Sequence, residues 1–194
     1  GGNVFVDYDE DGVLDVADEP YVYTDSNGAF SLTSTDSDAP IVVTTDSTIA
    51  GGLSVSAIDT SSNTSLTGIT LKAPTGSSVV SPTSTVAFDL METNGLTEAQ
   101  VATALGLDGV SILSFNPYAS GVNADTALAV EKVASQVMTT VKAISAAAEG
   151  AGANELGLDA TIDGAGAVNV ATLGTKYIST NEFLLVKIEA DAAW

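Results

Sequence analysis

The chain has 194 residues and a formal net charge of −20, from 25 acidic residues against five lysines, and it has no arginine, histidine or cysteine. These absences exclude an imidazole base, a thiol nucleophile, a zinc, haem or iron–sulfur site, and a guanidinium fork for phosphate. The acidic surface repels nucleic acid and anionic membranes, whereas a hydrophobic content of 45% argues against disorder. We therefore expect any bound metal to be a hard cation with oxygen ligands.

Short β-rich runs separated by polar turns occupy the first part of the chain. Apolar residues predict strands in VFV, YVY, AFSL, PIVVTT, LSVSAI and ITLKA. Turn residues lie between these runs, and Asp25-Ser-Asn-Gly28 is more typical of a hairpin turn than of a ligand set. This spacing predicts a small antiparallel β-sandwich over residues 1–73.

The pattern becomes helical after Pro74. Helices are predicted in STVAFDLMETN and in TEAQVATALGL, which starts with a capping box formed by Thr97 and Gln100. A longer helix, from about residue 124 to 149, has an apolar stripe at Val130, Val133, Val137, Val141 and Ile144.

The tail returns to β character, with strands predicted in DATID, AVNVATL and EFLLVKIEA. We predict a single two-lobed α+β domain over residues 1–194, with an antiparallel β-sandwich lobe at 1–73 and an inserted or companion helical lobe at 74–154. The C-terminal β segment, 155–194, is expected to return its strands to the β lobe. No stretch resembles a signal peptide or a membrane span, and the first residues, GGNVFV, suggest a piece cut from a longer chain.

The segment DYDEDGVLDVAD, residues 7–18, fits the calcium-loop template D-x-[DN]-x-[DN]-G. Gly12 falls at position 6, where the sharp turn needs a residue that tolerates positive φ. The predicted ligands are Asp7, Asp9, Asp11, the backbone carbonyl of Val13, Asp15 and Asp18. An EF-hand usually has glutamate at position 12, but Glu19 comes one residue late, and we expect Glu10 and Glu19 to point to solvent.

The loop follows a predicted strand, so an EF-hand sensor is not expected. A solvated acidic loop without metal is the alternative interpretation. That alternative is disfavoured because crowding these carboxylates costs free energy that only a cation offsets well.

Sparser carboxylates are weaker candidates for a further Ca²⁺ site. Asp36 and Asp38 can contribute to one, but a solvated loop explains them equally well. Asp59 lies in a polar loop, and Asp89 lies one turn from Glu92 on a predicted helix. We predict that more than one Ca²⁺ binds, with Asp36, Asp38, Asp59 and Asp89 as further ligands.

Asn116-Pro-Tyr118 places an aromatic side chain within a turn between helices. Tyr118 either anchors this loop between the lobes or lies at the rim of a ligand groove. Nothing in the sequence resembles a Ser–His or Ser-x-x-Lys arrangement. An aromatic content of 6% is also low for the sugar cleft of a glycosidase, so an enzyme is not expected.

Two parts of the sequence resemble known families. VFVDYDEDGVLDVADEP…YVYTDSNGAFSL resembles the start of the prealbumin-like B-type modules of bacterial surface adhesins, where a strand leads into a calcium loop. VSPTSTVAFDLMETNGLTEAQVATALGL…ILSFNPYAS resembles the helical companion attached to such modules in very large surface proteins. Together they make residues 2 to 150 similar to the peptide-binding domain of giant RTX adhesins. The resemblance does not cover the tail from about 155, and Thr83-Ser84-Thr85 departs from the usual Thr-Thr.

The resemblance implies an extracellular module on a bacterial cell surface that uses Ca²⁺ to bind the C-terminal end of peptides or proteins on another cell. It implies neighbouring adhesin domains in the same chain and a monomeric module. Asp59, Asp89, Asn116 and Tyr118 are the residues expected to contact this ligand. A spacer stiffened by Ca²⁺ and a Ca²⁺-dependent carbohydrate-binding module are the alternatives.

Overall fold

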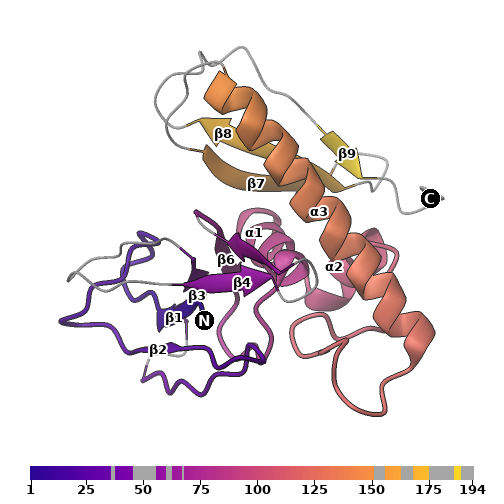
Figure 1. Cartoon of the computed structure of the whole chain (residues 1–194). Coiled ribbons are helices and arrows are strands. Elements are labelled where there is room, and N and C mark those ends of the chain that lie inside the picture. Colours follow the sequence, from indigo (N-terminus) through magenta and orange to yellow (C-terminus); the bar gives the residue numbers. More distant parts are fainter. Residues whose placement is uncertain are drawn as a thin grey trace. The chain divides into compact units, whose positions relative to one another are not determined.

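The computed structural model describes residues 1–35, 38–45, 56–59, 63–66, 68–150, 156–162, 168–174 and 186–188 (Figure 1). The chain is divided into two compact units, Gly1–Ser81 and Pro82–Trp194. The first is built on β-strands and the second combines helices with strands, so the expected mixed α+β class is confirmed.

A four-stranded antiparallel sheet organises the first unit, in the order β2-β1-β3-β6. Its strands are β1 (Asn3–Val6), β2 (Tyr21–Tyr23), β3 (Ile41–Thr44) and β6 (Thr70–Ala73). Their β-branched and aromatic residues suit a pleated, partly buried surface. All four residues of β1 are buried, as expected of a central strand covered on both faces.

The small apolar cluster of this unit contains a residue from the predicted calcium loop. Phe5 lies opposite Tyr21 on β2 and opposite Val42 on β3. Leu14 joins these three residues in one cluster and is only 3% exposed. Burial of a leucine side chain contributes on the order of 1.5–3 kcal/mol. Leu14 therefore fixes the middle of the loop to the sheet.

The sandwich arrangement is not confirmed by the residues that the structure describes. They contain instead a two-stranded antiparallel ribbon of β4 (Ala57–Asp59) and β5 (Thr64–Leu66). The run AFSL, which we expected to be a strand, is described and forms none. The first half of LSVSAI, residues 53–55, lies outside the described residues, and its last two residues, Ala57 and Ile58, belong to β4. The sandwich therefore remains a prediction.

Three helices form the second unit's α-helical part: α1 (Pro82–Asn94), α2 (Glu98–Ala104) and α3 (Ala124–Gly150). Pro82 suits the first position of a helix because its ring fixes φ and the missing N–H has no helical partner there. The capping box is confirmed: the Gln100 amide N–H donates to Thr97 Oγ1, and the Thr97 amide donates to Gln100 Oε1.

The core of the second unit is a continuous apolar cluster contributed by all three helices and the loop after α2. The expected stripe on α3 is confirmed at Val130, Val133 and Val137, which are all buried. The side chains of Val141 and Ile144 lie outside the described ones. Leu90 of α1 and Ile112 of the loop between α2 and α3 are fully buried in the same cluster.

The described C-terminal strands pair with one another rather than with the first sheet. These strands are β7 (Leu156–Ile162), β8 (Val168–Gly174) and β9 (Val186–Ile188), in the antiparallel order β7-β8-β9. β7 contacts α1, and α3 contacts all three strands (Figure 1). Pairing across a short connection costs little loop-closure entropy, which favours this local hairpin. The expected return of these strands to the β lobe is thus not seen in the described residues.

No helix in the described part of the chain is long and apolar enough to cross a membrane.

Candidate metal centre

The acidic loop connects two neighbouring strands of the sheet, β1 and β2. Hydrogen bonds fix its start, because Val6 N donates to Pro20 O at 3.1 Å and Asp7 N donates to Pro40 O at 3.0 Å. With Leu14 in the core, the loop is tied to the sheet at its two ends and at its middle. The carboxylates therefore project from a backbone whose path the sheet determines.

Asp7 is the buried member of the acidic group, with none of its surface exposed. Its Oδ2 accepts a hydrogen bond from Gly12 N at 2.9 Å and lies 3.9 Å from Lys72 Nζ. Its Oδ1 is buried without a hydrogen-bond partner. Burial raises the pKa of the Asp7 carboxyl above its usual value, although Lys72 and the Gly12 N–H oppose this rise. A buried carboxylate oxygen without a partner is costly unless a cation or donor reaches it.

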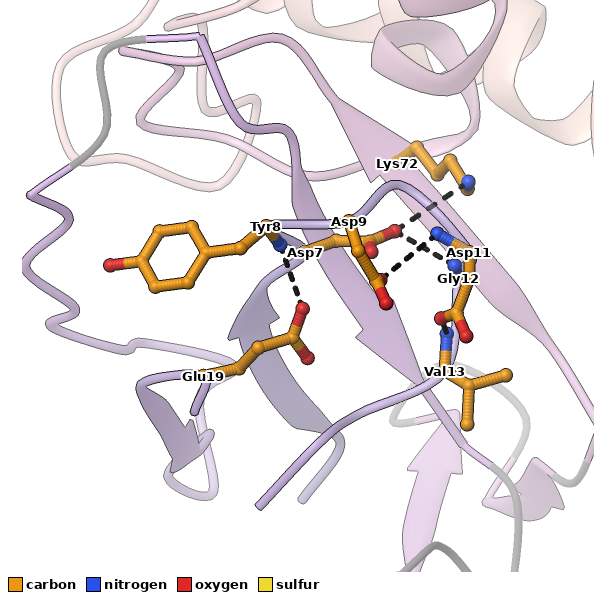
Figure 2. A network of polar contacts seen from close by, with 8 residues as sticks. All are labelled: Asp7, Tyr8, Asp9, Asp11, Gly12, Val13, Glu19 and Lys72. Atoms are coloured by element: carbon orange, nitrogen blue, oxygen red, sulfur yellow. Dashed lines mark hydrogen bonds and ion pairs between the residues drawn. The ribbon is translucent and has the colours of Figure 1, made fainter. Parts of the chain in front are cut away.

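Asp9 and Asp11 bring their carboxylates to the same place (Figure 2). One carboxylate oxygen from each of Asp7, Asp9 and Asp11 lies within 4.8 Å of the others. Asp9 Oδ1 accepts from Asp11 N at 3.4 Å, and Asp11 Oδ1 accepts from Val13 N at 2.7 Å. These local hydrogen bonds turn the chain so that alternate side chains converge. Gly12 has φ +77°, as its place in the template requires.

This arrangement fits a calcium ion. Two oxygens bound to one Ca²⁺ can lie at most about 5 Å apart, because each is 2.3–2.6 Å from the ion. The three carboxylates meet that limit, and Asp7 offers a buried oxygen that no protein group satisfies. Among the described residues, Asp7, Asp9 and Asp11 form the only group of three or more acidic side chains with this spacing.

Glu19 does not point to solvent, so that expectation was wrong. It is 6% exposed, and its two oxygens accept hydrogen bonds from Tyr8 N at 2.7 Å and Asp15 N at 2.8 Å. The calcium-loop template does not predict this role as a buried hydrogen-bond acceptor, because Glu19 lies one residue beyond position 12. A helical turn, in which Glu19 N donates to Asp15 O at 2.9 Å, absorbs the extra residue and brings Glu19 inward.

The predicted ligands Asp15 and Asp18 lie on the outside of the loop. Asp15 and Asp18 are exposed, and Asp15 Oδ1 accepts from Ala17 N at 3.1 Å. The backbone carbonyl of Val13 stays a predicted ligand, and the Val13 side chain is 57% exposed. The structure does not bring Asp15 or Asp18 into the cluster formed by Asp7, Asp9 and Asp11.

The candidates for a further ion lie on separate segments of the chain. Asp36 lies outside the described residues, and Asp38 is exposed. Asp59 ends β4 in the first unit, where its side chain is not described, whereas Asp89 is half-buried on α1 in the second unit. No second three-carboxylate cluster is found among the described side chains.

Tyr118 is exposed but held in one orientation. Its side chain is 78% exposed, and its hydroxyl donates to Glu131 Oε2 on α3 at 2.8 Å. Asn116 Oδ1 accepts from Tyr118 N at 2.9 Å and shapes the turn. Tyr118 is thus an anchor of its loop onto α3, and most of its ring remains open to solvent.

Lys72 is a residue of the site that the sequence analysis missed. A signal was available, since Lys72 is the only basic residue in the first 81 positions.

Comparison of the chain with protein-family models, with curated proteins and with solved structures gives no match in any of the three.

Proposed function

We propose that this chain is a Ca²⁺-binding module of an extracellular bacterial surface adhesin. The observation that carries the proposal is the buried Asp7 Oδ1, which has no protein partner and belongs to a carboxylate grouped with the exposed carboxylates of Asp9 and Asp11. A Ca²⁺ ion would give this oxygen a partner and offset the mutual repulsion of the three charges.

The ion in this loop stabilises the folded state of the module. Asp7 directly follows β1, and the loop leads into β2, so a cation held there links neighbouring strands of the sheet. Ligands that come together only in the folded chain make the binding free energy a contribution to folding. At a free Ca²⁺ concentration of 100 Kd this linkage stabilises the fold by about 2.7 kcal/mol.

We further propose that the module binds the free C-terminal end of a peptide or protein, with Ca²⁺ bridging the carboxylate. The resemblance to the peptide-binding domain of RTX adhesins supports this proposal. So does the charge of the chain, because a protein with net charge −20 and no arginine needs a cation to attract a carboxylate. Asp59, Asp89, Asn116 and Tyr118 remain the candidates for contact with this ligand.

A first experiment tests the metal. Thermal unfolding in excess EDTA and in millimolar Ca²⁺ should give a higher melting temperature with Ca²⁺, and this increase should disappear in the double variant Asp9→Ala/Asp11→Ala. The double variant Asp15→Ala/Asp18→Ala, which removes the same charge from outside the cluster, serves as the control and should retain most of the increase. An equal melting temperature in both buffers for the wild-type chain would rule out the calcium site.

A second experiment tests the ligand. The chain is applied to a peptide array with free C-termini and to the same peptides amidated, each with Ca²⁺ and with EDTA. Binding that needs both the free carboxylate and Ca²⁺ supports the proposal, whereas equal binding to amidated peptides contradicts the bridge.

A spacer stiffened by Ca²⁺ is the second candidate function. The burial of Asp7 favours it, because an ion held there serves the fold whether or not a ligand arrives. A calcium-dependent melting temperature together with no binding on the array would favour this spacer.

A further inference from the structure

Lys72 stands out in the sequence because its side chain is the only basic one in a strongly acidic segment. The first 81 residues contain ten aspartates and two glutamates but a single basic side chain, that of Lys72. This lysine lies on β6, opposite Val42 of β3, and its ammonium group approaches the one fully buried carboxylate of the loop (Figure 2). Its side chain is 28% exposed, so water screens the charge only in part.

Lys72 approaches one oxygen of the Asp7 carboxylate, and the other oxygen has no hydrogen-bond partner. Lys72 Nζ and Gly12 N both face Asp7 Oδ2, at 3.9 Å and 2.9 Å. The other oxygen, Oδ1, is the one without a partner. A Cβ atom added to Gly12 would lie 3.5 Å from Lys72 Nζ, so the ammonium group also rests against the turn of the loop. The contact with Lys72 therefore leaves Oδ1 without a competing hydrogen bond.

We propose that Lys72 is a built-in counter-ion of the calcium loop, which holds Asp7 in place before the metal binds and lowers the affinity of the loop for Ca²⁺. This inference rests on the proposed calcium site and assigns its affinity to a residue outside the loop. At 3.9 Å the contact is electrostatic rather than a short hydrogen bond, so its effect depends on charge more than on geometry.

The positive charge of Lys72 stabilises the metal-free loop and destabilises the metal-bound loop. Without metal, the ammonium group offsets the burial of Asp7 and the repulsion from Asp11 and Glu19. With metal bound, the same group repels the divalent ion across a few ångströms. Both effects reduce the free energy gained on binding. The loop is thereby tuned towards the weak, 10⁻⁴–10⁻³ M range that is typical of extracellular calcium modules.

The test compares Lys72→Met, which keeps the length and apolar stem of the side chain, with Lys132→Met. Lys132 is an exposed residue of α3, so its replacement makes the same change in net charge away from the loop. Isothermal titration with Ca²⁺ should show about tenfold tighter binding for Lys72→Met, which corresponds to about 1.4 kcal/mol. In EDTA the same variant should melt at a lower temperature than the wild-type chain. Lys132→Met should change neither quantity appreciably, and Lys72→Arg should keep the wild-type affinity.

A purely structural lysine would give a different result, because its loss would lower both the stability and the affinity. Unchanged or weaker Ca²⁺ binding by a Lys72→Met variant that is folded in EDTA overturns the inference but leaves the calcium site intact. If the wild-type chain itself binds no Ca²⁺, the proposed function fails as well.

Titration with Tb³⁺, a trivalent ion of similar size, keeps the test decisive if Lys72→Met unfolds without metal. The free energy needed to fold the Lys72→Met chain is then the same for both ions. The repulsion between the Lys72 ammonium group and the bound ion, in contrast, grows with the charge of the ion. The ratio of Tb³⁺ to Ca²⁺ affinity should therefore be higher in Lys72→Met than in the wild-type chain. An equal ratio overturns the inference.

Discussion

Glu19 is hydrogen-bonded to the backbone of Tyr8, eleven residues earlier, where Tyr8 N donates to Oε1 at 2.7 Å. Its second oxygen accepts from Asp15 N at 2.8 Å. One buried carboxylate thus joins the start, the middle and the end of the acidic loop. Two sets of contacts therefore hold the loop together: the hydrogen bonds of Glu19 and the contacts of Asp7 with Gly12 and Lys72.

Replacing Glu19 with alanine should destabilise the module strongly. The change leaves two backbone N–H groups of Tyr8 and Asp15 without their acceptor, and we expect a loss of about 2–4 kcal/mol in the free energy of unfolding. Urea denaturation in EDTA measures this loss in the absence of metal. Asp18→Ala is the matched control, since Asp18 is exposed and should change stability by less than about 0.5 kcal/mol. A larger effect for Asp18 than for Glu19 would restore Asp18 as the residue that closes the loop.

The stability of the metal-free protein should fall as the pH rises through the titration of Asp7. Burial holds the pKa of this carboxyl above 3.8, its ordinary value, so the folded chain binds more protons than the unfolded chain in the interval between the two. Stability then decreases with rising pH in that interval, and the contribution is fully present only below the unfolded value. Melting temperatures in EDTA from pH 3.5 upwards, compared between the wild-type chain and Asp7→Asn, isolate this contribution.

Bound Ca²⁺ should reverse the trend, because it favours the ionised form of Asp7. In saturating Ca²⁺ the wild-type chain should gain stability as the pH rises through the same interval, whereas Asp7→Asn should gain much less. Parallel curves for the two proteins in EDTA would show that Asp7 does not titrate abnormally.

Local sequence patterns predicted the parts of this protein that depend on local physics. The capping box at Thr97 depends on residues three positions apart, and the stripe from Val130 to Val137 depends on helical periodicity, so both could be read directly. The same holds for Asp7, Asp9 and Gly12, whose spacing within one loop brings two carboxylates and a positive φ together.

The parts that were missed depend on contacts between distant segments or on one extra residue. Lys72 reaches the loop only because β6 lies beside β3, which lies beside β1, and no local pattern encodes that strand order. Glu19 was misplaced because a rigid template cannot represent the extra helical turn before Pro20. The pairing of β7 with β8 competes with every other exposed strand edge, and periodicity does not decide which edge is chosen.

Loss of the α2 cap should weaken the second unit by a modest amount. Thr97→Ala removes the side-chain acceptor for Gln100 N, and we expect a cost of about 1 kcal/mol in the free energy of unfolding. Thr93→Ala is the matched control, because Thr93 is exposed within α1 and alanine has the higher helix propensity there. Chemical denaturation of both variants checks the prediction, and equal stability for the two would contradict the role of the cap.

Tyr118 allows the proposed ligand contact to be separated from the anchoring role. Tyr118→Phe removes the hydrogen bond to Glu131 but keeps the exposed ring, whereas Tyr118→Ala removes both. Because the hydrogen bond is exposed, we expect Tyr118→Phe to cost less than about 1 kcal/mol of stability. If the ring contacts the peptide, Tyr118→Phe should retain binding on the array of free C-termini, and Tyr118→Ala should lose at least about tenfold in affinity, which corresponds to about 1.4 kcal/mol. Equal loss in both variants would mean that the hydroxyl, through Glu131 and the loop conformation, matters more than the ring. Full binding by Tyr118→Ala would remove Tyr118 from the ligand site.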